Sequence, residues 1–142
     1  MDALLRESLI IAVQREQFSN LLKIKLLDLD TGYALVEMAY EPAAMNNIYE
    51  RAHGGAIFSL IDEAFQVAGQ TYGSIAVALN VNVTYIASPE PGSILRAEAK
   101  AVSTTKRTGT FQIRVTDESG RLIALCQALG FRTGKPIPFL QA

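Results

Sequence analysis

Residues 46–70 read NNIYERAHGGAIFSLIDEAFQVAGQ, and the rest of the chain has to fold around this stretch. From Gly55 onward, apolar residues recur at steps of three and four with no intervening proline, which predicts a long amphipathic helix. Gly73 is a typical residue with which to close it. Because one side of such a helix is apolar, the remaining chain must supply a surface that covers it.

Two adjacent acids fall on opposite sides of the predicted helix. Asp62 shares a face with Phe58 and Phe65, whereas Glu63 shares the polar face with Ser59 and is expected in solvent. An ionised carboxylate among aromatic side chains is costly unless it is paired or used in chemistry. Asp62 is therefore either a functional acid or one that is satisfied by a backbone donor or a basic partner.

The start of the helix combines His53, the single histidine, with Gly54 and Gly55. The first N–H groups of a helix have no partner within it, and the helix dipole is positive there. Glycine lacks a Cβ, so a ligand can approach the backbone closely. Two interpretations stay open, because the glycines could bind a developing oxyanion or could simply make a tight turn or a close helix–sheet contact.

The combination of Asn46, His53-Gly54-Gly55, Phe58-Ser59-Leu60 and Asp62 resembles the acyl-CoA thioesterases of the hotdog fold, in particular the phenylacetate-degradation type. In that family an Asn stands seven residues before the His and the acid eight after the first Gly, and both spacings hold here. The resemblance extends over nearly the whole chain. It implies an α+β fold in which an antiparallel sheet of about six strands wraps around one long helix, with a short N-terminal helix.

The resemblance also implies roles for single residues. Asp62 is the expected nucleophile or general base, and the sequence does not choose between the two. The Gly54 N–H is expected to polarise the thioester carbonyl, while His53 and Asn46 shape the loop or contact the thioester. Gly54, His53 and Asn46 would come from the partner of the subunit that supplies Asp62.

The chain departs from its relatives at two positions. Relatives often carry Gly between the Asn and the His, where this chain has Tyr49. Many carry Ser or Thr near the attacking water, at the position aligned with Ala78. The second departure leaves open how the water or acyl-enzyme step is assisted.

Five further residues are candidates for substrate contacts, and each has a plainer alternative. Gly55 belongs to the possible oxyanion turn, Phe58 could line an acyl pocket, and Asn82 could line a pocket wall or an interface. Lys106 and Arg107 stand in a predicted loop and could meet the phosphates of coenzyme A. The plainer alternatives are a tight turn for Gly55, a core position for Phe58, a solvated strand face for Asn82 and solvated loop charges for Lys106 and Arg107.

The rest of the sequence supplies the expected sheet. Apolar patterns predict a helix over 3–19, a hairpin over 23–40, a loop over 41–52, strands over 75–84, 94–102, 109–116 and 122–132, and an irregular tail from 134. A row of small residues, Leu95, Ala97, Ala99 and Ala101, would let the long helix lie close on the sheet. Exposed sheet edges favour a homodimer, further paired as a dimer of dimers.

Composition bounds the function. The chain has 142 residues, 49% hydrophobic and 19% charged, which predicts one domain over 1–142. Acidic and basic residues are mixed along the chain and the net charge is −1, which does not indicate binding to nucleic acid or to an anionic membrane. One cysteine and one histidine provide no His/Cys-rich metal site, and no cofactor is expected. No signal peptide or spanning segment is visible, so the expected location is cytoplasmic.

The predicted function is hydrolysis of a small aromatic or short- to medium-chain acyl-CoA to the free acid and CoA. Two alternatives are a non-catalytic acyl-CoA-binding hotdog protein and a hotdog hydratase acting on enoyl-CoA. The familiar hydratase chemistry uses an Asp/His dyad, and the lone histidine next to two glycines fits a thioesterase better.

Overall fold

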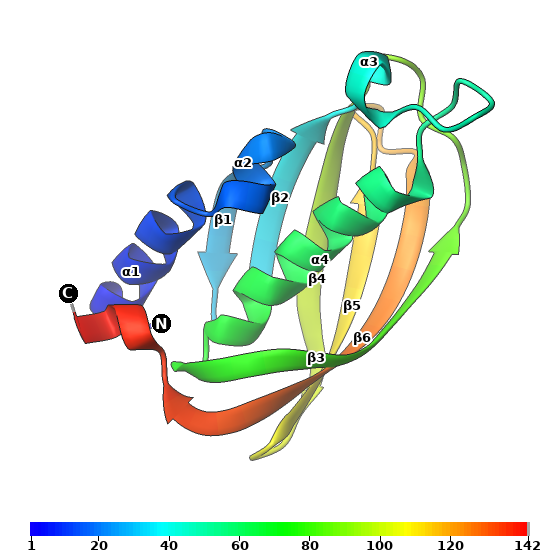
Figure 1. Cartoon of the computed structure of the whole chain (residues 1–142). Helices are drawn as coiled ribbons and strands as arrows, with labels where there is room; N and C mark the ends of the chain where they lie inside the picture. Colours follow the sequence, from blue (N-terminus) through cyan, green and yellow to red (C-terminus); the bar gives the residue numbers. More distant parts are fainter. Residues whose placement is uncertain (142) are drawn as a thin grey trace.

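The computed structural model describes residues 1–141. Six antiparallel strands form one sheet in the order β1-β2-β4-β5-β6-β3, and this sheet curves around the long helix α4 (Gly54–Gln70) (Figure 1). The predicted hotdog arrangement is therefore confirmed. The strands are β1 (Lys25–Asp30), β2 (Tyr33–Ala39), β3 (Ser74–Tyr85), β4 (Ile94–Thr104), β5 (Thr108–Thr116) and β6 (Leu122–Pro136).

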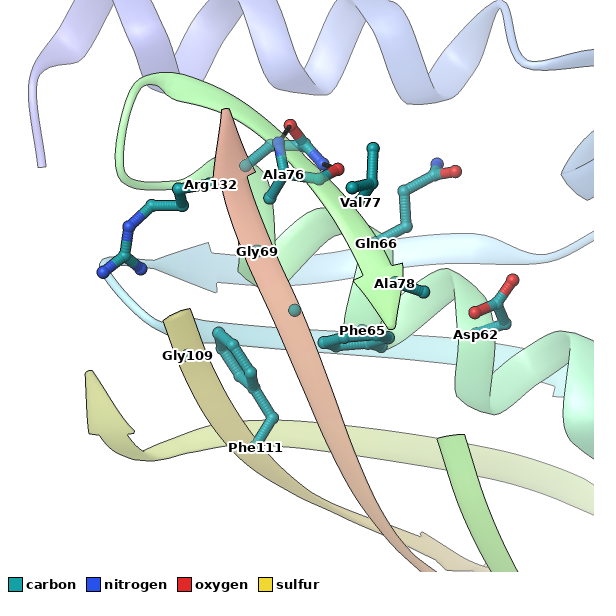
Figure 2. Close-up of a pocket in the computed structure, with 12 residues that line it drawn as sticks. Asp62, Phe65, Gln66, Gly69, Ala76, Val77, Ala78, Gly109, Phe111 and Arg132 are labelled. Carbon is teal, nitrogen blue, oxygen red and sulfur yellow. Dashed lines mark hydrogen bonds between the residues drawn. The ribbon is translucent and has the colours of Figure 1, made fainter. Parts of the chain in front are cut away.

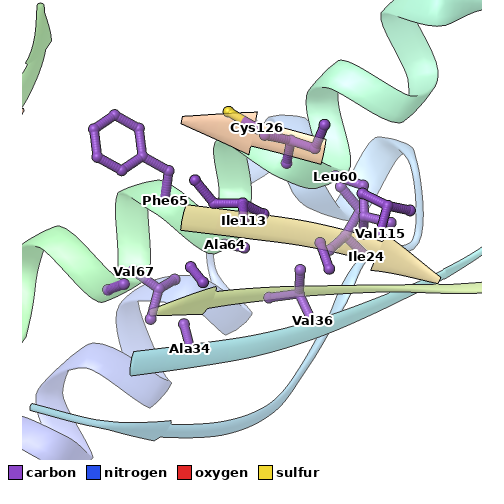
Figure 3. Packing of buried hydrophobic residues seen from close by; sticks show 14 of the residues in the cluster. Ile24, Ala34, Val36, Leu60, Ala64, Phe65, Val67, Ile113, Val115 and Cys126 are labelled. Atoms are coloured by element: carbon purple, nitrogen blue, oxygen red, sulfur yellow. The ribbon is translucent and has the colours of Figure 1, made fainter. Parts of the chain in front are cut away.

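The core lies between α4 and the concave face of the sheet (Figure 3). The small row of β4 behaves as predicted, since Ala97 and Ala99 are completely buried and allow α4 to lie close. Leu60 and Ile61 of α4 are equally buried. Burying one such aliphatic side chain contributes about 1.5–3 kcal/mol, so this contact fixes the helix on the sheet. Cys126 is also buried here, as predicted, and burial raises the pKa of its thiol to about 11.

The N-terminal region forms two helices instead of one. Asp2 caps α1 (Ala3–Gln14) by accepting the Leu5 N–H at 3.0 Å, and α2 (Gln17–Leu21) follows a break at Glu16. At this break the Glu16 carboxylate accepts a hydrogen bond from Gln66 of α4 at 2.9 Å, which ties the junction to the long helix. None of the helices within residues 1–141 has the length and apolarity that a bilayer crossing requires.

Two segments expected to be irregular are ordered. The predicted loop after β2 contains the short helix α3 (Pro42–Met45), which begins with proline at a position where its missing N–H is not needed. β6 continues to Pro136, which pairs with Ser74, and is followed by a 3₁₀ helix, η1 (Pro138–Gln141). Burial of Ile137 holds this end against the core, which the two prolines in the sequence concealed.

Strand β3 is an outer strand of the sheet, and a bulge interrupts its alternation. Ala78 pairs with Gly130 and Asn80 with Leu129, so Leu79 has no partner opposite it. The alternation predicted over 75–84 is therefore interrupted at Leu79, because one extra residue exchanges the two faces of a strand. Beyond it the half-buried Val81 and Val83 still alternate with the exposed Asn82. Val77 and Leu79 are 46% and 59% exposed in the single chain.

Candidate active site

A closed loop places Asn46 beside the start of α4. Asn46 bridges to Ala52, and the His53 N–H donates to the Met45 carbonyl at 2.7 Å. Inside the loop, the Asn47 side-chain oxygen accepts the N–H groups of Tyr49 at 2.9 Å and Arg51 at 3.1 Å. The loop is thus held by its own hydrogen bonds, and Asn47 is a turn former as the sequence suggested.

His53 is the N-cap of α4, and this role fixes its imidazole. Its Nδ1 accepts the Gly55 N–H at 2.8 Å. In a neutral imidazole the proton must then be on Nε2, which leaves Nε2–H as a donor. Within the described residues 1–141, the Gly54 N–H has no acceptor. One backbone donor therefore remains unused at the positive end of the helix dipole.

Two tyrosines hold this helix start, and the sequence pattern did not identify either role. The buried Tyr40 hydroxyl donates to the Asn46 side-chain oxygen, which leaves the Asn46 amide N–H groups as donors. The Tyr85 hydroxyl donates to the Gly54 carbonyl at 3.1 Å. A Cβ at Gly54 would lie 3.2 Å from the Tyr85 ring, so this close packing favours glycine. Only the fold brings Tyr40 and Tyr85 to one end of α4.

Asp62 lies two turns further along α4, at the mouth of a cavity (Figure 2). In the single chain its side chain is exposed, which corrects the expectation of a carboxylate on the buried face. The reason is the position of β3 at the edge of the sheet, since beyond this strand no segment of residues 1–141 covers that side of α4. Partial burial, and then the charge of Glu16, raise the pKa of Asp62.

Glu63 is the acid that the fold buries. It is 5% exposed, and its Oε1 atom has no hydrogen-bond partner within residues 1–141. Burial, followed by the charge of Glu16 and a hydrogen bond shared with it, raises the pKa of Glu63 to about 8. The prediction that Glu63 faces solvent is wrong, because the junction of α1 and α2 brings Glu16 against this side of α4. Periodicity within one helix cannot reveal such a covering segment.

The cavity beside Asp62 has a volume of about 240 Å³. Figure 2 shows Ala78 next to Asp62 at one end, and Arg132 and Gly109 at the other. Its walls come from α4, β3, β5 and β6, and they consist mainly of small and aromatic residues. The residues that line it are Asp62, Phe65, Gln66, Gly69, Gln70, Ala76, Val77, Ala78, Gly109, Phe111, Gly130 and Arg132.

Other predicted site residues lie apart from this cavity in the single chain. Phe58 is half-buried on α4, and Asn82 is exposed on β3, but neither lines the cavity. Lys106 and Arg107 are exposed in the connection between β4 and β5. Figure 1 places that connection at the end of the sheet opposite α3 and the start of α4. One chain thus gathers Asn46, His53 and Gly54, but not the basic pair.

Comparison with known proteins assigns the family. The family model described as the thioesterase superfamily matches residues 49–124, which is more than half of the chain. The chain belongs to the thioesterase superfamily. The acyl-coenzyme A thioesterase PaaI of Escherichia coli K12 is 30% identical to it over 124 residues, covering 87% of this chain and 88% of PaaI. The enzyme class expected from the sequence, a thioester hydrolase of the hotdog type, is confirmed.

Solved structures of this family agree with the fold. The E. coli PaaI protein from the phenylacetic acid degradation operon superimposes with a TM-score of 0.89 at 28% identity, covering 94% of this chain and 96% of PaaI. The TT0310 protein of Thermus thermophilus gives 0.79 at 36% identity, over 83% and 98% of the two chains. The smu.793 protein of Streptococcus mutans UA159, solved bound to acetyl-CoA, gives 0.75 at 25% identity, over 80% and 91%. The phenylacetate-degradation type is therefore confirmed.

Proposed function

We propose that this protein hydrolyses a small aromatic or short- to medium-chain acyl-CoA to the free acid and CoA. The observation that carries the proposal is that α4 presents both groups that the reaction needs. Its start has an unused Gly54 N–H, and further along the same helix Asp62 lies at the mouth of a cavity. The acyl-CoA activity named for E. coli PaaI and the acetyl-CoA bound to smu.793 support this substrate class.

In the proposed reaction, the thioester carbonyl accepts a hydrogen bond from the Gly54 N–H. Asp62 either removes a proton from a water that attacks the carbonyl carbon, or attacks that carbon itself to form an acyl-aspartyl anhydride that water then hydrolyses. In both cases the C–S bond breaks, the CoA thiolate leaves and takes up a proton, and the free acid is released. The amide stabilises the negative charge that develops on the carbonyl oxygen. His53, through Nε2–H, and Asn46, through its amide, are the other donors at this helix start.

The distance between the two groups favours a site shared between two chains. Gly54 and Asp62 are eight residues apart on one helix, which separates them by about 12 Å along its axis. A nucleophile and an oxyanion donor must both lie about 3 Å from one carbonyl group. We therefore infer a homodimer in which Asp62 of one chain faces Gly54 of the other, formed along the exposed edge of β3 and further paired as a dimer of dimers.

The predicted substrate contacts are kept as part of the proposal, with one restriction. The Gly55 N–H is engaged by His53, so Gly55 contributes only through close approach. Lys106 and Arg107 are exposed cations suited to the phosphates of CoA, while Phe58 and Asn82 would contribute at the interface of the dimer. A single domain over 1–142 and a cytoplasmic location also remain predictions.

The decisive variant is Asp62→Asn, assayed at pH 7 with a panel of acyl-CoA substrates. Because the amide can neither attack nor accept a proton, we expect kcat to fall by about 10²-fold or more. Glu63→Gln is the matched control, since the neighbouring acid is already neutral at this pH and its turnover should stay near the wild-type level. Asp62→Asn with most of the wild-type turnover would show that another group carries the reaction.

A non-catalytic acyl-CoA-binding protein is the second candidate, and one observation favours it. Ala78 lies beside Asp62 in the cavity, at the position where the family resemblance leads us to expect a hydroxyl side chain. Without that hydroxyl, the attacking water has one partner fewer. Incubation of the wild-type protein with stoichiometric acetyl-CoA and phenylacetyl-CoA separates the two functions. Thioesters that remain bound and intact for hours would indicate a binder, and released CoA would indicate the hydrolase.

A further inference from the structure

The cavity presents a largely apolar interior although four polar side chains line it, those of Asp62 at its mouth and of Gln66, Gln70 and Arg132. Gln70 exchanges two hydrogen bonds with the backbone of Ala76, at 2.9 and 3.0 Å. Gln66 donates to Glu16 at 2.9 Å. The Arg132 guanidinium donates to the carbonyls of Thr105 and Thr108 and lies over the Tyr72 ring, 4.7 Å from its centroid. Apart from Asp62, each of these polar side chains is thus engaged by at least one contact within the protein, so the interior chiefly offers hydrocarbon surface.

The size of the cavity limits what can enter. A buried apolar cavity of about 150 Å³ accommodates benzene. At about 240 Å³, this cavity accommodates a phenyl ring with its linking carbon, or a medium alkyl chain, and a much longer chain would have to leave it. Phe65 and Phe111 meet edge to face at its inner wall, with ring centroids 5.5 Å apart, and form a rigid stop.

Two glycines keep this volume open. A Cβ at Gly69 would lie 3.5 Å from Ala76 Cβ, and a Cβ at Gly130 would lie 3.4 Å from the Phe65 ring. Both distances are ordinary contacts, so the surrounding protein tolerates a methyl group at either position, and the methyl would occupy space on the cavity wall. Gly109 differs, because its Cβ would lie 2.8 Å from the Phe111 ring and would force that ring to move.

We propose that this cavity receives the acyl group of the substrate, selects it by apolar size alone, and takes its size limit from Gly69 and Gly130. The inference rests on the proposed thioesterase activity, since it places the acyl chain beyond the carbonyl that Asp62 attacks. It makes the two glycines specificity-determining residues. It also assigns the preferred acyl class, an unsubstituted aromatic or medium alkyl group without a distal polar substituent.

The test measures kcat/KM for acetyl-, butyryl-, hexanoyl-, phenylacetyl- and adipoyl-CoA with the wild-type enzyme, Gly69→Ala and Gly130→Ala. We expect the wild type to favour hexanoyl- and phenylacetyl-CoA over acetyl-CoA, and hexanoyl- over adipoyl-CoA, its counterpart with a distal carboxylate. In each variant the phenylacetyl-to-acetyl ratio of kcat/KM should fall by about tenfold or more. Gly69→Ala should also raise the melting temperature, because alanine is the better helix former, which separates lost fit from lost folding.

The possible results are distinguishable. If the wild type hydrolyses the panel but both variants keep its ratio of phenylacetyl to acetyl activity, the assignment of the glycines is overturned. A wild-type preference for adipoyl- over hexanoyl-CoA would overturn selection by apolar size. Hydrolysis of none of the five thioesters by the wild type would instead contradict the proposed function, on which this inference rests.

Discussion

Asp62 and Glu63 are adjacent in the chain and have opposite surroundings. Asp62 lies at an open cavity mouth, where partial burial and then the charge of Glu16 raise its pKa. Glu63 is held under the N-terminal helices near a second carboxyl group, so it keeps its proton at neutral pH. A buried protonated acid gives folding stability a definite pH dependence.

For Glu63 the sign follows from its pKa in the two states. An unfolded glutamate ionises near its ordinary value of 4.5, whereas the folded one keeps its proton until about pH 8. Between these values the folded state binds more protons than the unfolded state, so stability falls as pH rises and levels off above about pH 8. Glu63→Gln removes this loss. The free energy of unfolding of the variant, compared with that of the wild type, should therefore rise by on the order of a few kcal/mol between pH 5 and pH 8.

Melting temperatures of the wild type and Glu63→Gln between pH 4.5 and 9 would check this. The two curves should diverge as pH rises, with the variant higher. Glu7→Gln, at an exposed glutamate of α1, is the control and should follow the wild type throughout. Parallel curves for the wild type and Glu63→Gln would mean that Glu63 is ionised in the folded protein.

Helix α4 carries two groups of the proposed site, one at its start and one in its middle. Its first residue, Gly54, offers an unused N–H, and its third turn carries Asp62. The residue before Gly54 is already in the extended conformation, with φ −66° and ψ 133° at His53. That conformation is the one required before a proline, and proline is well accepted at the first position of a helix. The oxyanion donor can therefore be deleted without removing the helix.

Gly54→Pro and Gly54→Ala form a matched pair for this donor. Both add a Cβ against the Tyr85 ring, but only the proline removes the N–H. We expect kcat of Gly54→Pro to fall about 10²-fold or more below that of Gly54→Ala, which is the cost of losing one oxyanion donor. The comparison is valid if both variants keep the helical circular dichroism of the wild type. Equal kcat values in the two variants would show that this amide does not stabilise the transition state.

In the whole molecule, β3 is the last strand of the sheet, and its outer edge pairs with no other strand of residues 1–141. Val77 and Leu79 are exposed on this strand, beside the cavity that Asp62 adjoins. Open strand edges with apolar side chains are usually covered by another chain. A symmetric pairing would present the same elements of both chains to each other, and would create two equal sites. Each site would then use Asp62 of one chain and Gly54 of the other.

Mixing two inactive variants tests this division of the site. Asp62→Asn and Gly54→Pro should each be inactive alone, because every site in either homodimer carries a defect. After the subunits are exchanged, each mixed dimer has one intact site, so activity should return to about one quarter of the wild-type level. Native mass spectrometry would verify the exchange. A verified mixture that stays inactive would show that both groups act within one chain.

The sequence by itself predicted the long helix and the strands, because each shows as apolar spacing along neighbouring residues. The sheet around the helix and the grouping of Asn46, His53 and Gly54 followed from the family resemblance. The sequence also indicated the family through its motif spacings, and the comparisons confirm that family. The sequence did not predict the break at Glu16 or the bulge at Leu79, since the apolar pattern continues across both positions.

Only the tertiary structure decided which acid is buried and where the cavity lies. The helix period placed Asp62 inside and Glu63 outside, and the fold reversed them, because β3 ends the sheet on one side of α4 while the N-terminal helices cover the other. Gly69 and Gly130 line one cavity although they are far apart in sequence. Periodicity gives the faces of a helix, but only the neighbouring segments determine which of those faces meets water.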